Sequence, residues 1–142
     1  DTVAAAVSDS SRFDVFQLAD AVILGDLPRA IRILRGLRGE GLEPPVILWA
    51  IAREVRTIAR AQSLVGQGRA VGDAMASLKV WKSRRPVIQS AMRRMSRRRA
   101  HELLRQAARA DRVIKGAVKG DAWTEITGLV MAAAGPAVER AA

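Results

Sequence analysis

The chain has 142 residues, which is enough for one domain with a single hydrophobic core and short for two. About half of the residues (49%) are apolar and 27% are charged, which is typical of a globular protein rather than a disordered one. Cysteine is absent, so disulfides, thiolate metal sites and cysteine nucleophiles are excluded.

The formal net charge of +10 favours polyanionic partners. The surplus is nearly all arginine, because lysine occurs only at Lys79, Lys82, Lys115 and Lys119. Alanine and glycine are abundant, and asparagine and tyrosine are absent. A GC-rich genome produces the same profile in proteins of any function, so both explanations of the charge stay open.

The longest apolar run, residues 44–52, is well short of the roughly 20 residues that a membrane-spanning helix needs. No basic and apolar leader opens the chain, and we expect a soluble, cytoplasmic protein. The sequence begins with Asp1 rather than Met, and we therefore expect a piece of a longer protein.

Apolar residues recur at spacings of three and four almost throughout, and Gly, Pro and Asp separate these stretches. The pattern predicts an all-α protein, a compact bundle of about seven helices with short connections and without the fixed repeat of a solenoid. The predicted segments are a helical turn at 3–7 and helices at about 15–24, 26–38, 44–65, 70–78, 84–95, 96–115 and 121–134.

Helix starts are marked by Asp26, Ser96 and Asp121, whose short side chains accept hydrogen bonds from free amides of a first turn. Pro28 and Pro86 fall in first turns, where a missing N–H costs nothing. The predicted core residues are Val15, Leu18, Ala19, Val22, Ile23, Ala30, Ile31, Leu34, Leu37, Ile47, Leu48, Ile51, Val55, Ile58, Ala100, Leu103, Leu104, Ala107, Ile114, Trp123, Ile126, Leu129, Val130 and Ala133.

Catalytic motifs are missing. His101 is the only histidine, whereas a catalytic triad or a two-histidine zinc site needs partners that the chain lacks. The glycines in residues 66–72 depart from the dinucleotide-binding spacing and follow a helix rather than a strand, and there is no Walker loop. We therefore expect no catalytic residue, no cofactor and no metal site.

Arginine is concentrated around the predicted start of the helix at 96–115. With Ser96 as N-cap, three of these arginines occupy the first helical turn, where the macrodipole disfavours cations, so helix stability does not explain them. Met92 and Met95 mark the buried side of the preceding helix, and we expect all five arginines to reach solvent at one corner. This arginine corner is either a solvated surface or a contact for phosphate or an acidic partner. The candidate polyanion-contact residues are Arg93, Arg94, Arg97, Arg98 and Arg99.

A second candidate surface follows the helix at 44–65. Its residues, the Trp49 stripe, have i, i+4, i+7 and i+11 spacing and are Trp49, Arg53, Arg56 and Arg60. Trp and Arg are enriched in protein interface hot spots, and Arg53 can stack on Trp49 one turn away. The alternative is a tryptophan at the core edge, covered by arginine stems. We expect the other two tryptophans, Trp81 and Trp123, to pack in the core.

The segment 11–60 resembles the C-terminal domain of the delta subunit of bacterial DNA polymerase III, a component of the sliding-clamp loader. The resemblance spans essentially the whole chain and is more specific before Gly66 than after it. The residues that carry it are Phe13, Phe16, Ala19, Asp20, Ala21, Gly25, Asp26, Arg29, Ala30, Ile33, Leu34, Leu37, Glu40, Gly41, Glu43, Pro44, Leu48, Trp49, Ala52, Arg53, Glu54, Val80, Trp81, Arg84, Arg85, Trp123, Glu125, Gly128 and Leu129.

The resemblance implies that residues 1–142 form one helical collar domain, without the two N-terminal AAA+ type domains of that subunit. In the family, collars of three gamma or tau copies, one delta and one delta-prime close into a ring. Delta does not hydrolyse ATP and contacts the sliding clamp through its N-terminal domain, so this chain is expected to have neither activity. The Trp49 stripe is then the candidate subunit interface. The alternative is an independent basic module that binds nucleic acid through the arginine corner.

Overall fold

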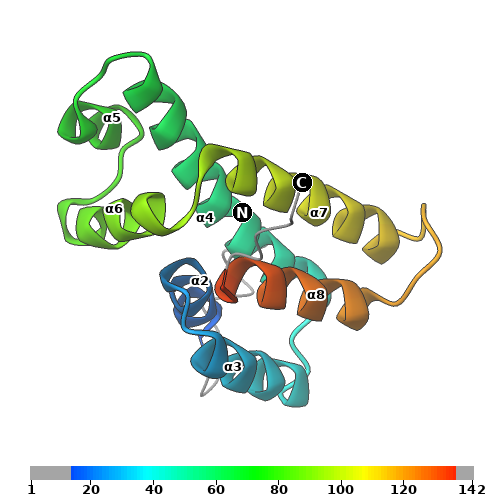
Figure 1. Ribbon diagram of the computed structural model, residues 1–142. Coiled ribbons are helices and arrows are strands. Elements are labelled where there is room, and N and C mark those ends of the chain that lie inside the picture. The colour runs from blue at the N-terminus through cyan, green and yellow to red at the C-terminus, as the bar shows by residue number, and fades with distance from the viewer. Residues whose placement is uncertain (1–13, 137–142) are drawn as a thin grey trace.

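The computed structural model describes residues 14–136, which contain seven α-helices, one short 3-10 helix and no strand. The prediction of an all-α fold is confirmed (Figure 1). The helices are α2 (Val15–Leu24), α3 (Leu27–Gly39), α4 (Pro44–Gly66), α5 (Val71–Ser77), η1 (Lys82–Arg84), α6 (Arg85–Arg94), α7 (Arg97–Ile114) and α8 (Ala122–Ala134). The predicted turn at 3–7 lies outside the described residues.

The long helix α4 is the centre of the bundle. It packs against α2, α5, α6, α7 and α8, and its most extensive contact is with α7. Figure 1 shows α5 and α6 gathered around one end of α4, with α2, α3 and α8 toward the other end. This arrangement leaves α7 along one edge of the molecule, between α4 and α8.

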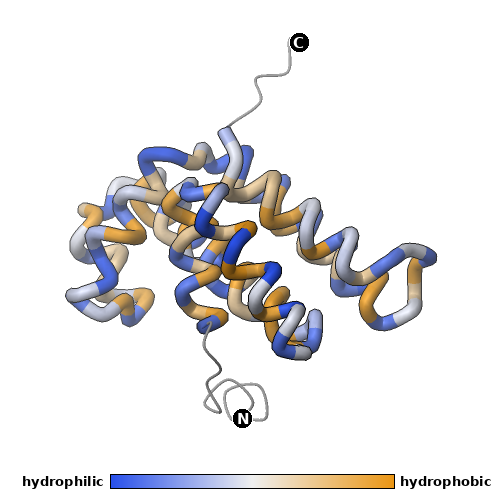
Figure 2. The backbone as a smooth tube through the Cα atoms, turned by 90° about the horizontal axis from the view of Figure 1, so that it is seen from below, coloured by the Kyte–Doolittle hydropathy of each residue, from blue (hydrophilic) through white to orange (hydrophobic). Residues whose placement is uncertain are grey.

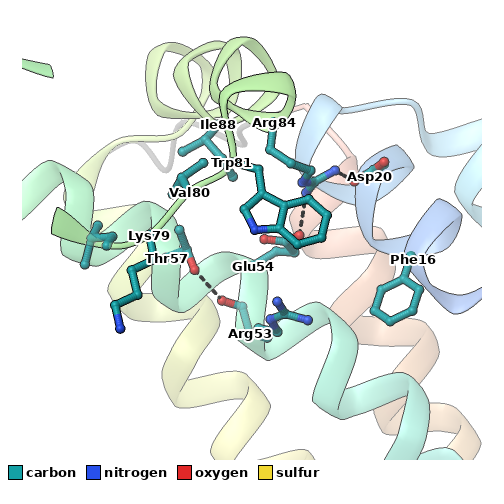
Figure 3. A pocket seen from close by; sticks show the side chains of 11 residues that line it. Phe16, Asp20, Arg53, Glu54, Thr57, Lys79, Val80, Trp81, Arg84 and Ile88 are labelled. Atoms are coloured by element: carbon teal, nitrogen blue, oxygen red, sulfur yellow. Dashed lines mark hydrogen bonds and ion pairs between the residues drawn. The ribbon is translucent and has the colours of Figure 1, made fainter. Parts of the chain in front are cut away.

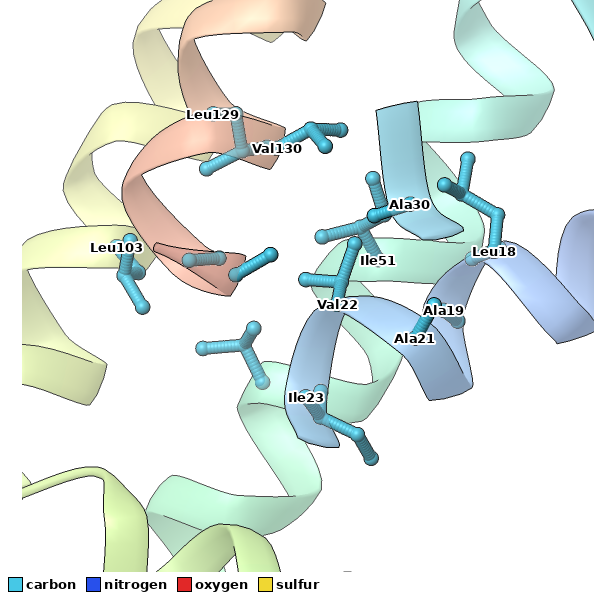
Figure 4. Close-up of a cluster of buried hydrophobic side chains, with 14 of the residues drawn as sticks. Leu18, Ala19, Ala21, Val22, Ile23, Ala30, Ile51, Leu103, Leu129 and Val130 are labelled. Carbon is cyan, nitrogen blue, oxygen red and sulfur yellow. The ribbon is translucent and has the colours of Figure 1, made fainter. Parts of the chain in front are cut away.

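The core is one continuous cluster of apolar side chains to which all seven α-helices contribute. The contribution of α5 is the smallest and consists of Met75. Val22 and Ile23 of α2, Ile51 of α4 and Leu129 of α8 all belong to this cluster (Figure 4). Along the tube of Figure 2, hydrophobic and hydrophilic residues alternate every few positions, as expected for helices that bury one face.

Short polar side chains fix the helix starts. The carboxylates of Asp26 and Asp121 accept from amides three residues later, at 3.2 Å and 2.9 Å, and the Ser96 hydroxyl accepts from the Arg99 amide at 3.0 Å. These three predicted caps are confirmed. Asp14 caps α2 by accepting from the amide two residues later, that of Phe16, at 2.8 Å, and this cap was not predicted.

The predicted core residues are mostly buried, with four exceptions, Ile31, Leu104, Ile114 and Trp123, which are half-buried and pack against the core edge. In α3 the buried stripe includes Ile33 rather than Ile31, because Ile33 completes the i, i+3, i+4, i+7 spacing from Ala30. In α7 the buried face extends to Ala110 and Val113 for the same reason. The predicted helix at 84–95 begins as η1 and continues as α6.

Candidate interaction surface

A groove with a volume of about 390 Å³ opens between α2, α4 and the segment that joins α5 to α6 (Figure 3). Phe16 contributes from α2, Arg53 and Thr57 from α4, and Val80 and Trp81 from the joining segment. Apolar and aromatic side chains therefore line the groove together with basic ones. This composition is typical of a surface that binds another protein.

Arg84 holds the joining segment against the two helices. Its guanidinium donates to the carboxylate of Asp20 on α2 at 2.6 Å and to the carboxylate of Glu54 on α4. Burial alone would lower the pKa of Arg84, but the bond to Asp20 and the charge of Glu54 together raise the pKa above its ordinary value. The two carboxylates are thus neutralised inside the groove, whereas Arg53 and Lys79, which also line it, form no ion pair within residues 14–136.

Trp81 is the most exposed large apolar side chain in the described part of the chain, with 78% of its surface accessible. The prediction that Trp81 packs in the core is wrong. Val80 packs on the core, and because the backbone at Trp81 is extended (φ −60°, ψ 145°), the next side chain points away from it. The flanking basic residues, Lys79 and Lys82, were a sequence signal for this exposure.

The Trp49 stripe adjoins the groove. The indole of Trp49 is half-buried, meets the ring of Phe16 edge to face at 6.0 Å, and carries the guanidinium of Arg53 at 5.6 Å from its centroid. The predicted stacking of Arg53 on Trp49 is confirmed. Arg56 and Arg60 are exposed on the same side of α4, opposite its buried face. Phe16 and Arg53 therefore connect the stripe to the groove.

The arginine corner is smaller than predicted, because Arg94 turns inward. Its guanidinium donates to the carbonyls of Val22 (3.1 Å) and Ile23 (3.2 Å) at the end of α2. It also donates to the carbonyls of Ala133 and Gly135 (3.4 Å) at the end of α8. The last carbonyls of a helix have no partner within the helix and carry negative charge, so one cation satisfies two helix ends. Burial, and secondly the charge of Arg99, lower the pKa of Arg94.

Arg99 is also only partly exposed. It donates to the carbonyl of Ala132 in α8 at 2.6 Å and forms an ion pair with Glu102. The prediction that all five arginines are exposed to solvent is therefore wrong for Arg94 and Arg99, whose guanidinium groups donate hydrogen bonds to helix carbonyls. The three that remain exposed are Arg93, Arg97 and Arg98.

Trp123, the other tryptophan predicted to pack in the core, is half-buried at the core edge. The guanidinium of Arg38 lies 5.0 Å from its ring centroid.

His101 is exposed on α7. Within residues 14–136, no three His, Asp or Glu side chains are grouped closely enough to hold a metal ion. No helix in this described range is long and apolar enough to cross a membrane.

A family model described as the C-terminal part of the DNA polymerase III processivity clamp loader gamma complex matches residues 15–139. The chain belongs to this clamp-loader family. The matched range covers every described helix, including the groove and the Trp49 stripe.

Two relatives of this clamp-loader chain are DNA polymerase III delta subunits. The Haemophilus influenzae protein is 30% identical over 89% of the chain, and the Escherichia coli protein is 31% identical over 87%. The chain spans only 39% and 36% of the length of these relatives. A solved structure, the Bacillus subtilis DNA clamp loader delta protein, superposes with a TM-score of 0.68 over 82% of the chain and 34% of that protein, at 20% identity. This likeness establishes the fold.

Proposed function

We propose that this chain is the collar domain of a DNA polymerase III delta subunit. It holds delta in the clamp-loader ring that loads the sliding clamp onto DNA. The observation that carries the proposal is the family match over residues 15–139, together with two relatives that are delta subunits by name. The domain acts as a structural joint and performs no chemistry of its own.

The proposed partners are the collar domains of gamma or tau and of delta-prime. A ring of unlike subunits uses heterologous contacts, so two different faces of each collar meet two different neighbours. The proposed subunit interface comprises the Trp49 stripe and the adjoining groove. Exposed aromatic side chains with arginine beside them are the residue types that contribute most to binding energy at protein interfaces.

Nucleotide binding and the contact with the sliding clamp belong to AAA+ type domains outside residues 1–142. A role as an independent nucleic-acid module based on the arginine corner is not favoured, because Arg94 and Arg99 are occupied by carbonyls of α2 and α8.

The test is capture of purified gamma and delta-prime C-terminal domains of the same species on the immobilised chain at 0.3 M salt. The double variant Arg53→Glu and Arg56→Glu is expected to lose at least one partner while keeping its helical circular dichroism. The matched control, Arg105→Glu and Arg112→Glu, makes the same charge change on α7 and should capture normally. Capture of both partners by the Arg53 and Arg56 variant contradicts the interface, and failure of the unmodified chain to capture either contradicts the collar function.

A further inference from the structure

The outward side of α7 forms a second basic surface, separate from the Trp49 stripe. The buried residues of α7 are Ala100, Leu103, Ala107, Ala110 and Val113. At 3.6 residues per turn, Arg98, Arg105 and Arg112 lie opposite that buried face, and all three are exposed. They are seven residues apart, or about 10 Å along the helix axis at each step. We call these three residues the α7 ridge.

Acidic side chains near the ridge are already neutralised. Glu102 forms ion pairs with Arg98 and Arg99, and a hydrogen bond from Arg99 is the main cause of the lowered pKa of its carboxyl group. Asp111 pairs with Lys115 at 2.9 Å. From the neighbouring helix, Glu125 pairs with Arg109 at 3.1 Å.

Every described carboxylate on α7 and α8 therefore already has a basic partner. The side chain of Arg98 is 90% exposed, so its pairing with Glu102 is weak and easily exchanged. Figure 1 shows α7 at the edge of the bundle.

The composition of the ridge selects the kind of partner. The other exposed residues between its arginines are His101, Ala108 and Arg109, so the surface has no large apolar or aromatic group. A protein interface needs an apolar centre, a membrane-surface helix needs an apolar face to insert, and single strands need aromatic platforms for their bases. Contacts to duplex phosphates need only positioned cations.

We propose that the α7 ridge binds the phosphate backbone of duplex DNA without reading its sequence. The Trp49 stripe and the ridge then have different partners, because the stripe carries an aromatic anchor and the ridge does not. This proposal goes beyond the collar role, since a subunit joint requires no DNA contact of its own.

The test is fluorescence anisotropy of a labelled 30-base-pair duplex titrated with the chain at 50 mM and 200 mM NaCl. If the three ridge arginines each neutralise one phosphate, affinity falls by about 40-fold between these salt concentrations. The variant Arg105→Gln and Arg112→Gln should bind at least tenfold more weakly at 50 mM NaCl. Its affinity should change only about fourfold over the same salt range, because one ridge phosphate contact remains.

The matched control is Arg53→Gln and Arg56→Gln, which removes the same charge from α4. This control is expected to keep both the affinity and the 40-fold salt effect within a factor of two. Equal weakening in both variants would show that binding follows net charge rather than the ridge, and would overturn the proposal. The same conclusion follows if the unmodified chain does not bind at 50 mM NaCl, or binds the labelled single strand more tightly than the duplex.

Discussion

Arg94 is expected to be the most important arginine for the stability of the fold. The substitution Arg94→Met keeps much of the length of the side chain but removes every donor that reaches the ends of α2 and α8. Four carbonyls then lose their charged partner in a region that is only partly open to water. The substitution therefore acts on two helices at once.

The size of the effect follows from these contacts. A hydrogen bond to a charged group contributes about 1.5–3 kcal/mol net, and a cation at a helix C-terminus contributes about 0.3–2 kcal/mol. Because Arg94 is half-buried, water replaces part of what is lost, and the four contacts do not add in full. We expect unfolding to become easier by about 3 kcal/mol, which for a chain of this length lowers the melting temperature by about 12 °C.

The assay is urea unfolding followed by circular dichroism, with thermal melts in parallel. Arg93→Met is the matched control, because it removes the same charge from the adjacent, exposed position and should change stability by less than about 0.5 kcal/mol. If Arg94→Met and Arg93→Met unfold at the same urea concentration, the hydrogen bonds of Arg94 do not stabilise the ends of α2 and α8, and the reasoning is refuted.

Three further predictions concern a turn, a cap and the exposed indole. Gly25→Ala should destabilise by about 2 kcal/mol in urea titrations, because φ is 79° and a Cβ would lie 2.8 Å from the Arg94 side chain, whereas Gly39→Ala, with free space around it, should be neutral or stabilising. The backbone and hydroxyl bonds from Thr124 lower the pKa of Asp121, so its contribution to stability is complete above its ordinary pKa of 3.8 and is lost as pH falls through the lower folded value. As pH falls below about 4, the melting temperature of Asp121→Asn should therefore fall less than that of the unmodified chain. Parallel curves of melting temperature against pH would contradict the cap. Trp81→Phe should remove most of the iodide-quenchable fluorescence, and unchanged quenching would place this indole in the interior.

Local patterns predicted the helices because their causes lie within a few residues. The cap at Ser96 and the stacking of Arg53 on Trp49 both join positions three or four apart, which spacing alone reveals. Gly25 ends α2 in the left-handed conformation that glycine adopts without strain.

Long-range contacts decided what the sequence could not predict. The carbonyls that Arg94 binds in α2 are more than 70 positions away, and whether it reaches them depends on how α2, α6 and α8 pack. Trp81 was placed wrongly because a bulky aromatic residue is usually buried, whereas the bonds of Arg84 to α2 and α4 hold this segment with its indole outward. The same packing brings Phe16 to Trp49 and so joins the groove to the stripe.

The collar function is tested most directly by the molar mass of a mixture, measured by light scattering behind size exclusion. The chain is mixed with the C-terminal domains of gamma and delta-prime after nuclease treatment, at 0.3 M NaCl. We predict a co-eluting species heavier than any component and persistent at this salt concentration, because a packed collar contact rests mainly on apolar burial. Separate elution of all three domains would contradict the proposed collar function.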